Sequence, residues 1–455
     1  MKLSSLSFLT YAGLASALTQ QCTGNAVNEG GNWFCGAVRQ ILYEGFSRSG
    51  SYNSVTRMGN DGSCQFQPFS YNGALGPLSE DVSVATSRSD KARADKDQQL
   101  SIHIRGPFKL KEFAVYKLDS KQKRDTVPSP HAHGHGHGHD HLHGRNKKRG
   151  QWVTAVINGQ VVSWENTWFG GPATQAAPAP VAAAPTKATG TVSKPKPKPK
   201  PKPQAEKPKE VSGSKTRGHW KRISYYNAQR RVADNVMFMG NYGGEGSGVF
   251  DTTWGNSLSY LNANGNGGSS SPKVLKHIFI PSNKEFAIFS AEKCDKSCGY
   301  SRVPDMAYKG FSGSNKIFLF HFKMPQDGKT GFNGNMPALW ALNGRIPRTM
   351  QYGACSCWKT GCGEVDIYEV LASGDNKCKS TFHMNNGAGS SDYFRRPADK
   401  YIKVAVVFCE RTSSVAIKQL PDSFDFGSAL SDETVRSWIR SSSSSKGGSL
   451  FQMAN

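Results

Sequence analysis

The chain has 455 residues and a formal net charge of +23, with 57 Lys and Arg residues against 34 Asp and Glu. Inside a cell, a basic excess of this size would indicate a nucleic-acid partner, but the chain opens with an export signal, which argues against nucleic acid. Apart from that signal, no stretch has the roughly 18 consecutive apolar residues that span a bilayer, so no membrane anchor is predicted.

Residues 1–17 are predicted to be a signal peptide. Lys2 supplies the positive start, residues 3–14 are mostly apolar or small, and residues 15–17 have the small-x-small pattern of a cleavage site. Export exposes the ten cysteines to an oxidising compartment, so we expect structural disulfides rather than metal-binding or catalytic thiols. Three cysteines precede the central linker and seven follow it, so if all of them pair within the chain, at least one disulfide joins the two halves.

Residues 18–120 are rich in Gly, Ser and Asn, which favours an N-terminal β region. Alternating apolar residues at 100–104 predict one strand, and the apolar run 113–116 predicts another. The segment 121–150 follows. Its dibasic pairs at 123–124 and 147–149 are hypothetical sites of proteolytic processing.

The same segment carries seven histidines, which alternate mainly with Gly between His131 and His143. Neutral imidazoles on a flexible chain bind Zn²⁺ or Cu²⁺ only weakly, because nothing fixes their geometry. We interpret this tract as a spacer with weak metal binding, and a physiological metal site is the alternative.

Residues 151–171 form a short Trp-bearing island, and residues 172–217 are an Ala/Pro and Lys-Pro linker. Five consecutive Lys-Pro pairs at 194–203 favour an extended polyproline-II spacer. Eleven basic residues and two acidic ones lie within 194–222, so much of the net charge belongs to this solvated tether.

Residues 218–440 have aromatic and β-branched runs divided by Gly, Asn and Ser turns, which is typical of an antiparallel β-sandwich. Within this region, residues 314–325 and 334–342 predict two strands, the second displaying Trp340, and residues 381–387 predict a strand that carries His383. Each strand can also be interpreted simply as sandwich core. Residues 441–455 are a Ser-rich tail.

The segment 363–371 places three acids within six residues of one strand. Side chains two apart share a face, so Glu364 and Asp366 point the same way, whereas Glu369 falls out of step by one residue. A bulge near residues 367–368 would return Glu369 to the face of the other two. About 13 Å would then separate the two Glu backbones, and side chains leaning inward can close this towards the 5–5.5 Å of a retaining glycosidase pair.

Three acids on one face repel one another, which raises at least one pKa. That cost makes sense where one carboxylate attacks as an anion while another delivers a proton to a departing sugar oxygen. The alternative is a solvated acidic face on an ordinary strand.

These residues resemble the family-16 glycoside hydrolases, in which an E-x-D-x-x-E strand is preceded by a Pro-Ala-x-Trp strand and followed by a His-bearing one. The resemblance implies a concanavalin-like β-jelly-roll. It also implies Glu364 as the nucleophile, Asp366 as the residue supporting its charge state and Glu369 as the acid/base. Trp340 would stack on a sugar ring and His383 would line the cleft.

The whole chain looks closer to the fungal circularly permuted 1,3-β-glucanases, because the late strands of the family-16 order are missing after Glu369. This resemblance implies a secreted cell-wall protein in which N-terminal strands, including residues 113–117, complete the sandwich. It further implies that residues 354–362, with three cysteines, form a disulfide-pinned loop at the cleft edge. Trp358 in that loop would contact sugar.

The resulting hypothesis is a retaining endo-β-1,3-glucanase that acts on cell-wall β-glucan by double displacement and needs no cofactor or metal. The β-1,3 preference rests on the resemblance. Two alternatives stay open: a glucan transglycosylase that uses the same residues, and a non-catalytic wall protein that binds glucan through its aromatic side chains.

Overall fold

The computed structural model describes residues 22–79, 99–118, 220–385, 387–440 and 447–453, and the backbone of residues 152–157 and 160–165. The predicted signal peptide, the His-rich segment with its dibasic pairs and the Lys-Pro linker lie outside these residues. Among the described residues, no helix is long and apolar enough to cross a membrane.

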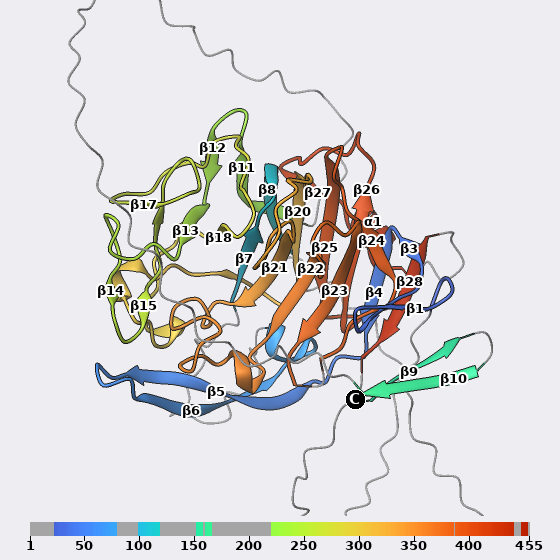
Figure 1. The fold of residues 1–455 in the computed structure, drawn as a ribbon, viewed down its shortest axis with the longest axis horizontal. Helices are drawn as coiled ribbons and strands as arrows, with labels where there is room; N and C mark the ends of the chain where they lie inside the picture. Colours follow the sequence, from blue (N-terminus) through green and yellow to red (C-terminus); the bar gives the residue numbers. More distant parts are fainter. Residues whose placement is uncertain are drawn as a thin grey trace, which may run out of the picture. The chain divides into compact units, whose positions relative to one another are not determined.

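Most described strands belong to two large sheets (Figure 1). The first sheet has nine strands. In spatial order they are β12 (Val232–Asp234), β11 (Trp220–Asn227), β8 (Lys109–Leu118), β20 (Lys316–Lys323), β25 (Ile402–Cys409), β26 (Ser414–Leu420), β4 (Gln40–Glu44) and β28 (Gly448–Gln452), with β27 (Ala429–Leu430) paired to β11.

The second sheet has eleven strands and carries the acidic segment. In spatial order they are β17 (Gly268–Ser269), β16 (Ser259–Leu261), β13 (Met237–Gly240), β18 (Glu285–Phe289), β7 (Gln99–Arg105), β21 (Ala338–Asn343), β22 (Glu364–Glu369), β23 (Lys377–His383), β24 (Tyr393–Arg395) and β3 (Ala37–Val38), with β19 (Phe311–Ser312) paired to β7.

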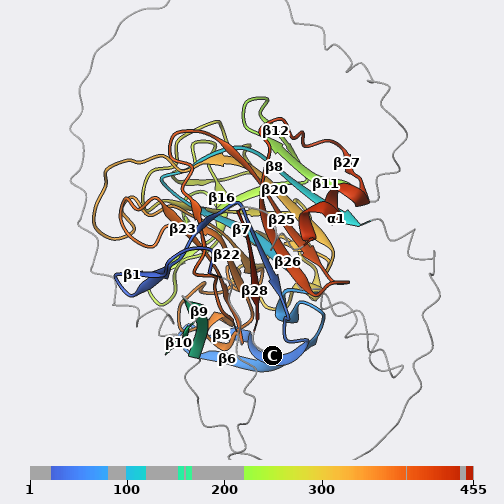
Figure 2. The same cartoon turned by 90° about the vertical axis from the view of Figure 1, so that its right-hand side faces the viewer.

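Smaller elements complete the described fold. Four two-stranded sheets are β1 (Val27–Glu29) with β2 (Asn32–Phe34), β5 (Ser49–Met58) with β6 (Cys64–Asn72), β9 (Trp152–Ile157) with β10 (Gln160–Glu165), and β14 (Phe250–Asp251) with β15 (Gly255–Asn256). The helix α1 (Asp432–Ile439) lies against β25 and β26 (Figure 2). Its N-cap is Ser431, whose hydroxyl accepts a hydrogen bond from the Thr434 amide.

One hydrophobic core lies between the two large sheets. It joins Ile102, Leu339 and Val365 of the eleven-stranded sheet to Phe318 and Val404 of the nine-stranded sheet, all of them fully buried. Because alternate residues of a strand face opposite ways, each sheet has a second, outer face. This arrangement confirms the predicted all-β sandwich.

The N-terminal part of the chain is threaded through both sheets, as the predicted permutation requires. β7 lies between β18 and β21, β8 lies between β11 and β20, and β4 lies between β26 and β28. In the residues after the linker, these places would be gaps. The strands before the linker therefore complete the sandwich rather than form a domain of their own.

The cysteines also join the two parts of the chain. The disulfide Cys64–Cys355 links the β5–β6 hairpin to the loop before β22, and Cys22–Cys35, Cys294–Cys298 and Cys357–Cys362 are local. The predicted bridge between the halves is therefore present. The premise of complete pairing was wrong, however, because two described cysteines, Cys378 and Cys409, are buried and unpaired.

The structure differs from the sequence interpretation at the C-terminal tail. Part of the segment that we assigned to a Ser-rich tail is β28, which pairs in parallel with β4 at the edge of the nine-stranded sheet. The apolar residue Phe451 explains the difference, since its side chain is fully buried in the core.

The long connection between β8 and β11 should be dispensable for folding. Leu118 and Trp220 are directly paired antiparallel neighbours, so a two-residue turn could join them. We expect a chain with Asn-Gly in place of residues 119–219 to be secreted and to unfold cooperatively, with a Tm within about 4 °C of the parent. Circular dichroism on heating measures this, and loss of the cooperative transition would show that the excised residues support the sandwich.

Candidate active site

The three acids of β22 share one face of the eleven-stranded sheet because of a bulge. On one side, Ala338, Trp340 and Leu342 of β21 pair with Glu369, Asp366 and Glu364, so Ile367 is the extra residue in β22. Alternate residues of β21 point to one side, and their partners point there too. The bulge predicted near residues 367–368 is confirmed.

Strand β23 gives the same result on the other side of β22. His383 pairs with Glu364, Thr381 with Asp366 and Lys379 with Glu369, and these three residues also alternate along their strand. The intervening residues of β22, Val365, Ile367 and Tyr368, belong to the core between the sheets. The acidic side chains therefore lie on the outer face.

Hydrogen-bond donors surround the Glu364 carboxyl group. The Tyr352 hydroxyl donates to Oε1 over 2.9 Å, and the Trp358 indole donates to Oε2. Tyr352 is in turn held by the Trp340 indole, whose Nε1 donates to the Tyr352 hydroxyl over 2.8 Å. Because both Glu364 oxygens accept hydrogen bonds, this geometry favours its carboxylate form.

The other two acids have basic neighbours. Nε2 of His383 lies 2.8 Å from Oδ2 of Asp366. Nη2 of Arg105 donates to Oε1 of Glu369 over 3.2 Å, while Nε of Arg105 donates to the Met336 carbonyl over 2.9 Å. Arg105 is thus held by the backbone and directed at one carboxyl group.

Burial raises the pKa values of all three acids. The pKa of Glu364 rises to about 8, first through burial and secondly through the nearby Asp366. Burial raises the pKa of Asp366 to about 7, against the opposing charge of Arg105. The pKa of Glu369 rises to about 7 through burial and then Asp366, although Arg105 and His383 oppose the rise. The predicted repulsion is present, but it is second to burial.

These pKa shifts predict a stability that falls as pH rises. Between the ordinary carboxyl pKa near 4 and the raised values near 7–8, the folded chain binds more protons than the unfolded chain. The associated stabilisation is complete at low pH and is lost through that window. We expect Tm to fall from about pH 5 to about pH 8, and the fall should be smaller in Glu364→Gln, measured by differential scanning fluorimetry. An equal slope in the variant would contradict the buried placement of Glu364.

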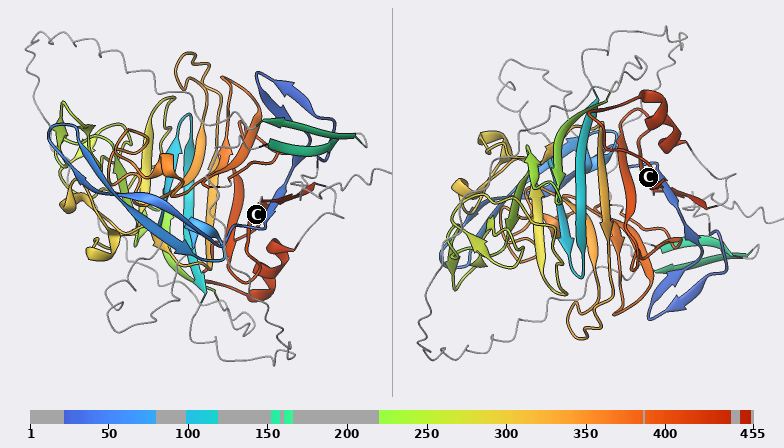
Figure 3. Two further views of the ribbon diagram at one scale, coloured as in Figure 1. Left: turned by 90° about the horizontal axis from the view of Figure 1, so that it is seen from below. Right: turned by 90° about the horizontal axis from the view of Figure 1, so that it is seen from above.

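A cover lies over this acidic face. Tyr52, Phe69 and Tyr71 of the β5–β6 hairpin pack in one cluster with Trp340 and Leu342. Figure 3 (left) shows the hairpin crossing in front of the central strands. The exposed fraction is 6% for Glu364, 4% for Asp366 and 15% for the Glu369 side chain. Access to Glu369 is therefore the least restricted.

Disulfides attach the cover to the sheet. Cys357–Cys362 closes the short loop that carries Trp358, and Cys64–Cys355 ties that loop to β6. The backbone N–H of Asn53 also donates to the Thr360 hydroxyl over 3.0 Å. The predicted disulfide-pinned loop is thus observed beside the acids.

Trp340 does not form an exposed platform in this structure. It is only 3% exposed, its ring lies 5.4 Å from that of His103, and its indole N–H is engaged by Tyr352. Its polar neighbours explain the burial, because they satisfy the indole under the cover. Trp358 is partly buried and contacts Glu364 directly.

Sequence reasoning missed Arg105 and Tyr352. Arg105 follows the strand predicted at 100–104 and ends the observed β7. It is more than 250 positions away from Glu369, so only the spatial order of the strands brings them together. Tyr352 precedes the cysteine-rich loop, and no periodic pattern marks it. The only sequence feature that could have indicated Tyr352 is its proximity to that loop.

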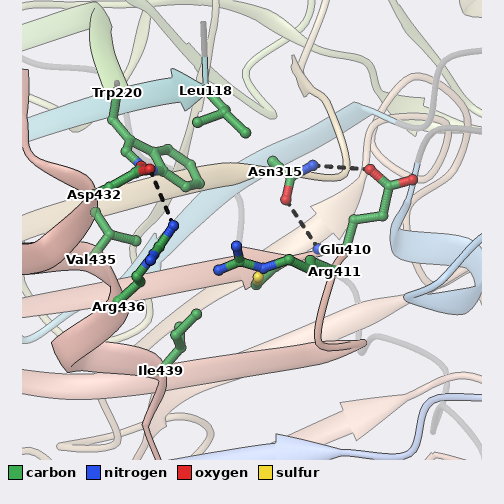
Figure 4. Close-up of a pocket in the computed structure, with 10 residues that line it drawn as sticks. Leu118, Trp220, Asn315, Glu410, Arg411, Asp432, Val435, Arg436 and Ile439 are labelled. Atoms are coloured by element: carbon green, nitrogen blue, oxygen red, sulfur yellow. Dashed lines mark hydrogen bonds and ion pairs between the residues drawn. The ribbon is translucent and has the colours of Figure 1, made fainter. Parts of the chain in front are cut away.

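A separate pocket of about 450 Å³ lies on the outer side of the nine-stranded sheet, beside α1 (Figure 4). Trp220 donates its indole N–H to Asp432 there, and Glu410 accepts from the Asn315 amide. None of the acids of β22 lines it. Its acidic residues are Glu410 and Asp432, whereas the acids of β22 lie on the opposite side of the sandwich.

Comparison with known proteins adds a family likeness. Residues 218–438 match the family described as Cell wall protein YJL171C/Tos1, C-terminal, and residues 39–87 match Cell wall protein YJL171C/Tos1, N-terminal.

Relatives match nearly the whole chain. A Candida albicans protein named probable circularly permuted 1,3-beta-glucanase TOS1 is 37% identical over 491 residues, which cover 98% of this chain and 99% of the relative. A similarly named protein of Arthroderma benhamiae is 39% identical over 443 residues, with 93% and 94% covered. TOS1 of Saccharomyces cerevisiae is 35% identical over 472 residues, with 97% and 99% covered. No solved structure is significantly similar to this chain.

Proposed function

Because this chain belongs to the Tos1/YJL171C family of cell-wall proteins, whose relatives are named probable circularly permuted 1,3-beta-glucanases, we propose that it is a secreted retaining endo-β-1,3-glucanase of the cell wall. The observation that carries the proposal is the bulge at Ile367. It places Glu364, Asp366 and Glu369 on one sheet face.

In the first step, the Glu364 carboxylate attacks the anomeric carbon of the sugar on the non-leaving side. Glu369 donates its proton to the glycosidic oxygen, and the bond between that oxygen and the anomeric carbon breaks. In the second step, Glu369 takes a proton from water, which attacks the anomeric carbon and frees Glu364. Two inversions leave the β configuration unchanged.

The hydrogen bonds support these roles. Glu364 accepts from Tyr352 and Trp358, and such donors stabilise an anion before attack. Burial and the nearby Asp366 outweigh these donors and keep the pKa of Glu364 at about 8, so we assign the anion to Glu364 on geometry, because donors face both of its oxygens. A pKa of about 7 for Glu369 suits a group that gives and then takes a proton. His383 lies beside Asp366 and opposes the rise in the pKa values of Glu364 and Glu369.

The low exposure of the acids requires the cover to shift when glucan binds. The Trp358 indole occupies one Glu364 oxygen, so the loop that carries it must yield before the anomeric carbon can approach. Trp358 is then placed to contact the sugar that displaces it. The disulfides at each side of Trp358 restrict this movement to the loop itself.

The same cover favours one alternative, a transglycosylase. With carboxyl groups this little exposed, water has restricted access to a covalent intermediate, and a second glucan chain could take its place. Hydrolysis and transfer share the first step and differ in the acceptor.

Incubation of the secreted protein with laminari-oligosaccharides tests the proposal. We expect products that are first formed with β configuration, observed by proton NMR before mutarotation. Both reactions release a shorter leaving fragment, so shorter products alone indicate hydrolysis, and products longer than the substrate indicate transfer. Glucan binding without any product would instead establish a non-catalytic wall protein.

A further inference from the structure

A small polar pocket lies on the same sheet face as the acids. Its volume is about 220 Å³, and its lining includes His103, Asn241, Tyr242, Glu285 and Gln351. None of the three acids of β22 lines this cavity, and the proposed reaction does not use it.

Strand register fixes how the pocket lies relative to the acids. Glu285 of β18 pairs with Arg105 of β7, Arg105 pairs with Ala338 of β21, and Ala338 pairs with Glu369 of β22. Directly paired residues share a face, so Glu285 and Glu369 belong to one row across the sheet. Three strand spacings separate them by about 14 Å, which a few linked sugar rings can bridge.

Hydrogen bonds hold the polar groups of the pocket in place. Glu285 Oε1 accepts from the Gln351 amide over 2.9 Å and lies 3.4 Å from Nδ1 of His103. Oε2 of Glu285 has no hydrogen-bond partner within the described residues, and the side chain is about one-third exposed. A preorganised carboxylate with a free oxygen suits a pair of sugar hydroxyls.

An aromatic ring forms another wall. A Cβ atom on Gly240 would lie 2.8 Å from the Tyr242 ring, so the ring rests against the backbone where a side chain is missing. Amides, a carboxylate and a ring face together suit a neutral, hydroxyl-rich ligand. The lining also pairs one acidic side chain, Glu285, with one lysine, Lys284, which suits a ligand without net charge.

A loop beside the pocket exposes a second aromatic side chain. Phe332 is 83% exposed, and its neighbour Asn333 donates an amide hydrogen bond to Asn283 in the pocket wall over 3.5 Å. The backbone N–H of Asn335 also donates to the Ser282 hydroxyl over 2.8 Å. The loop is therefore attached to the pocket wall, with the Phe332 side chain in solvent.

We propose that this pocket binds one pyranose ring of the same glucan chain that reaches the acids of β22. The inference rests on the proposed function for the identity of the polymer. The glucan would cross β21 and β7 between the two places, so only oligosaccharides long enough to span them would engage both.

Binding to an inactive protein tests this inference apart from cleavage. In a Glu364→Gln background, isothermal titration calorimetry would compare a laminari-trimer with a laminari-hexamer. We expect the hexamer to bind more tightly. Adding Tyr242→Ala or Glu285→Gln should weaken binding of the hexamer about tenfold, the equivalent of about 1.4 kcal/mol. The affinity for the trimer should change by less than about twofold.

Matched controls identify the cause. Tyr242→Phe keeps the ring and should keep most of the affinity. Glu410→Gln makes the same chemical change in the pocket beside α1 and should have no effect. Unchanged hexamer binding in both pocket variants would overturn the inference, as would a parent that binds no oligosaccharide. Length-dependent binding without any cleavage by the wild type would instead reject the catalytic proposal and keep the pocket.

Discussion

Glu364→Gln should lower glucan cleavage by about 10⁴-fold or more, while the protein stays folded and retains glucan. The amide has nearly the same shape as the carboxyl group and can still accept from Tyr352 or Trp358, but it cannot attack an anomeric carbon. Reducing-end release from laminarin measures the loss. Residual activity above about one-hundredth of the parent would exclude Glu364 as the nucleophile.

Chemical rescue distinguishes a missing nucleophile from a damaged fold. In Glu364→Ala, the removed side chain leaves room for azide on the face opposite the leaving group. With an activated aryl β-glucoside, we expect azide to restore turnover and to yield a product of α configuration. Glu410→Gln, on the other side of the sandwich, serves as the control and should retain full activity.

The strands of the sandwich could be predicted because their residue patterns are local. Residues 100–104 alternate in polarity and form part of β7, and the extra residue before Glu369 demanded a bulge that β22 contains at Ile367. In both cases a period of two, or its interruption, decides which side of a strand each residue faces.

The environment of the acids could not be predicted in the same way. The β5–β6 hairpin packs on Trp340 beside the acids, and Arg105 donates to Glu369. Both come from the part of the chain before the linker. Such contacts depend on three-dimensional strand order. A single sequence shows that two segments are strands, but not that one will lie beside the other.

Aromatic residues show the limit most clearly. Trp340 is the residue type that typically stacks on sugars, yet it lies beneath the cover and orients Tyr352. Phe332 is exposed, but no sequence motif marks it. Whether an indole faces sugar or core is decided by what packs over it. Here that element is a hairpin almost three hundred positions away in sequence.

Glu369→Gln should separate the two halves of the proposed reaction. On natural glucan the leaving oxygen needs a proton, so we expect activity to fall by about 10³-fold, within the range for loss of a general acid. On a dinitrophenyl β-glucoside the leaving group departs without a proton. The first step should then be nearly unaffected, and the glycosylated enzyme should accumulate and be visible as a mass increase on Glu364.

Azide gives this variant an outcome opposite to that of Glu364→Ala. It should attack the covalent intermediate and yield a product of β configuration, because an anionic nucleophile needs no general base.

Arg105→Met provides a second readout. Removing the cation beside Glu369 should raise its pKa further, so the alkaline limb of the pH–rate profile should move to higher pH. Arg105→Lys should move it less. If both Glu369→Gln and Arg105→Met left the leaving-group dependence and the pH profile unchanged, Glu369 would not be the acid/base, and the proton would have to come from another group.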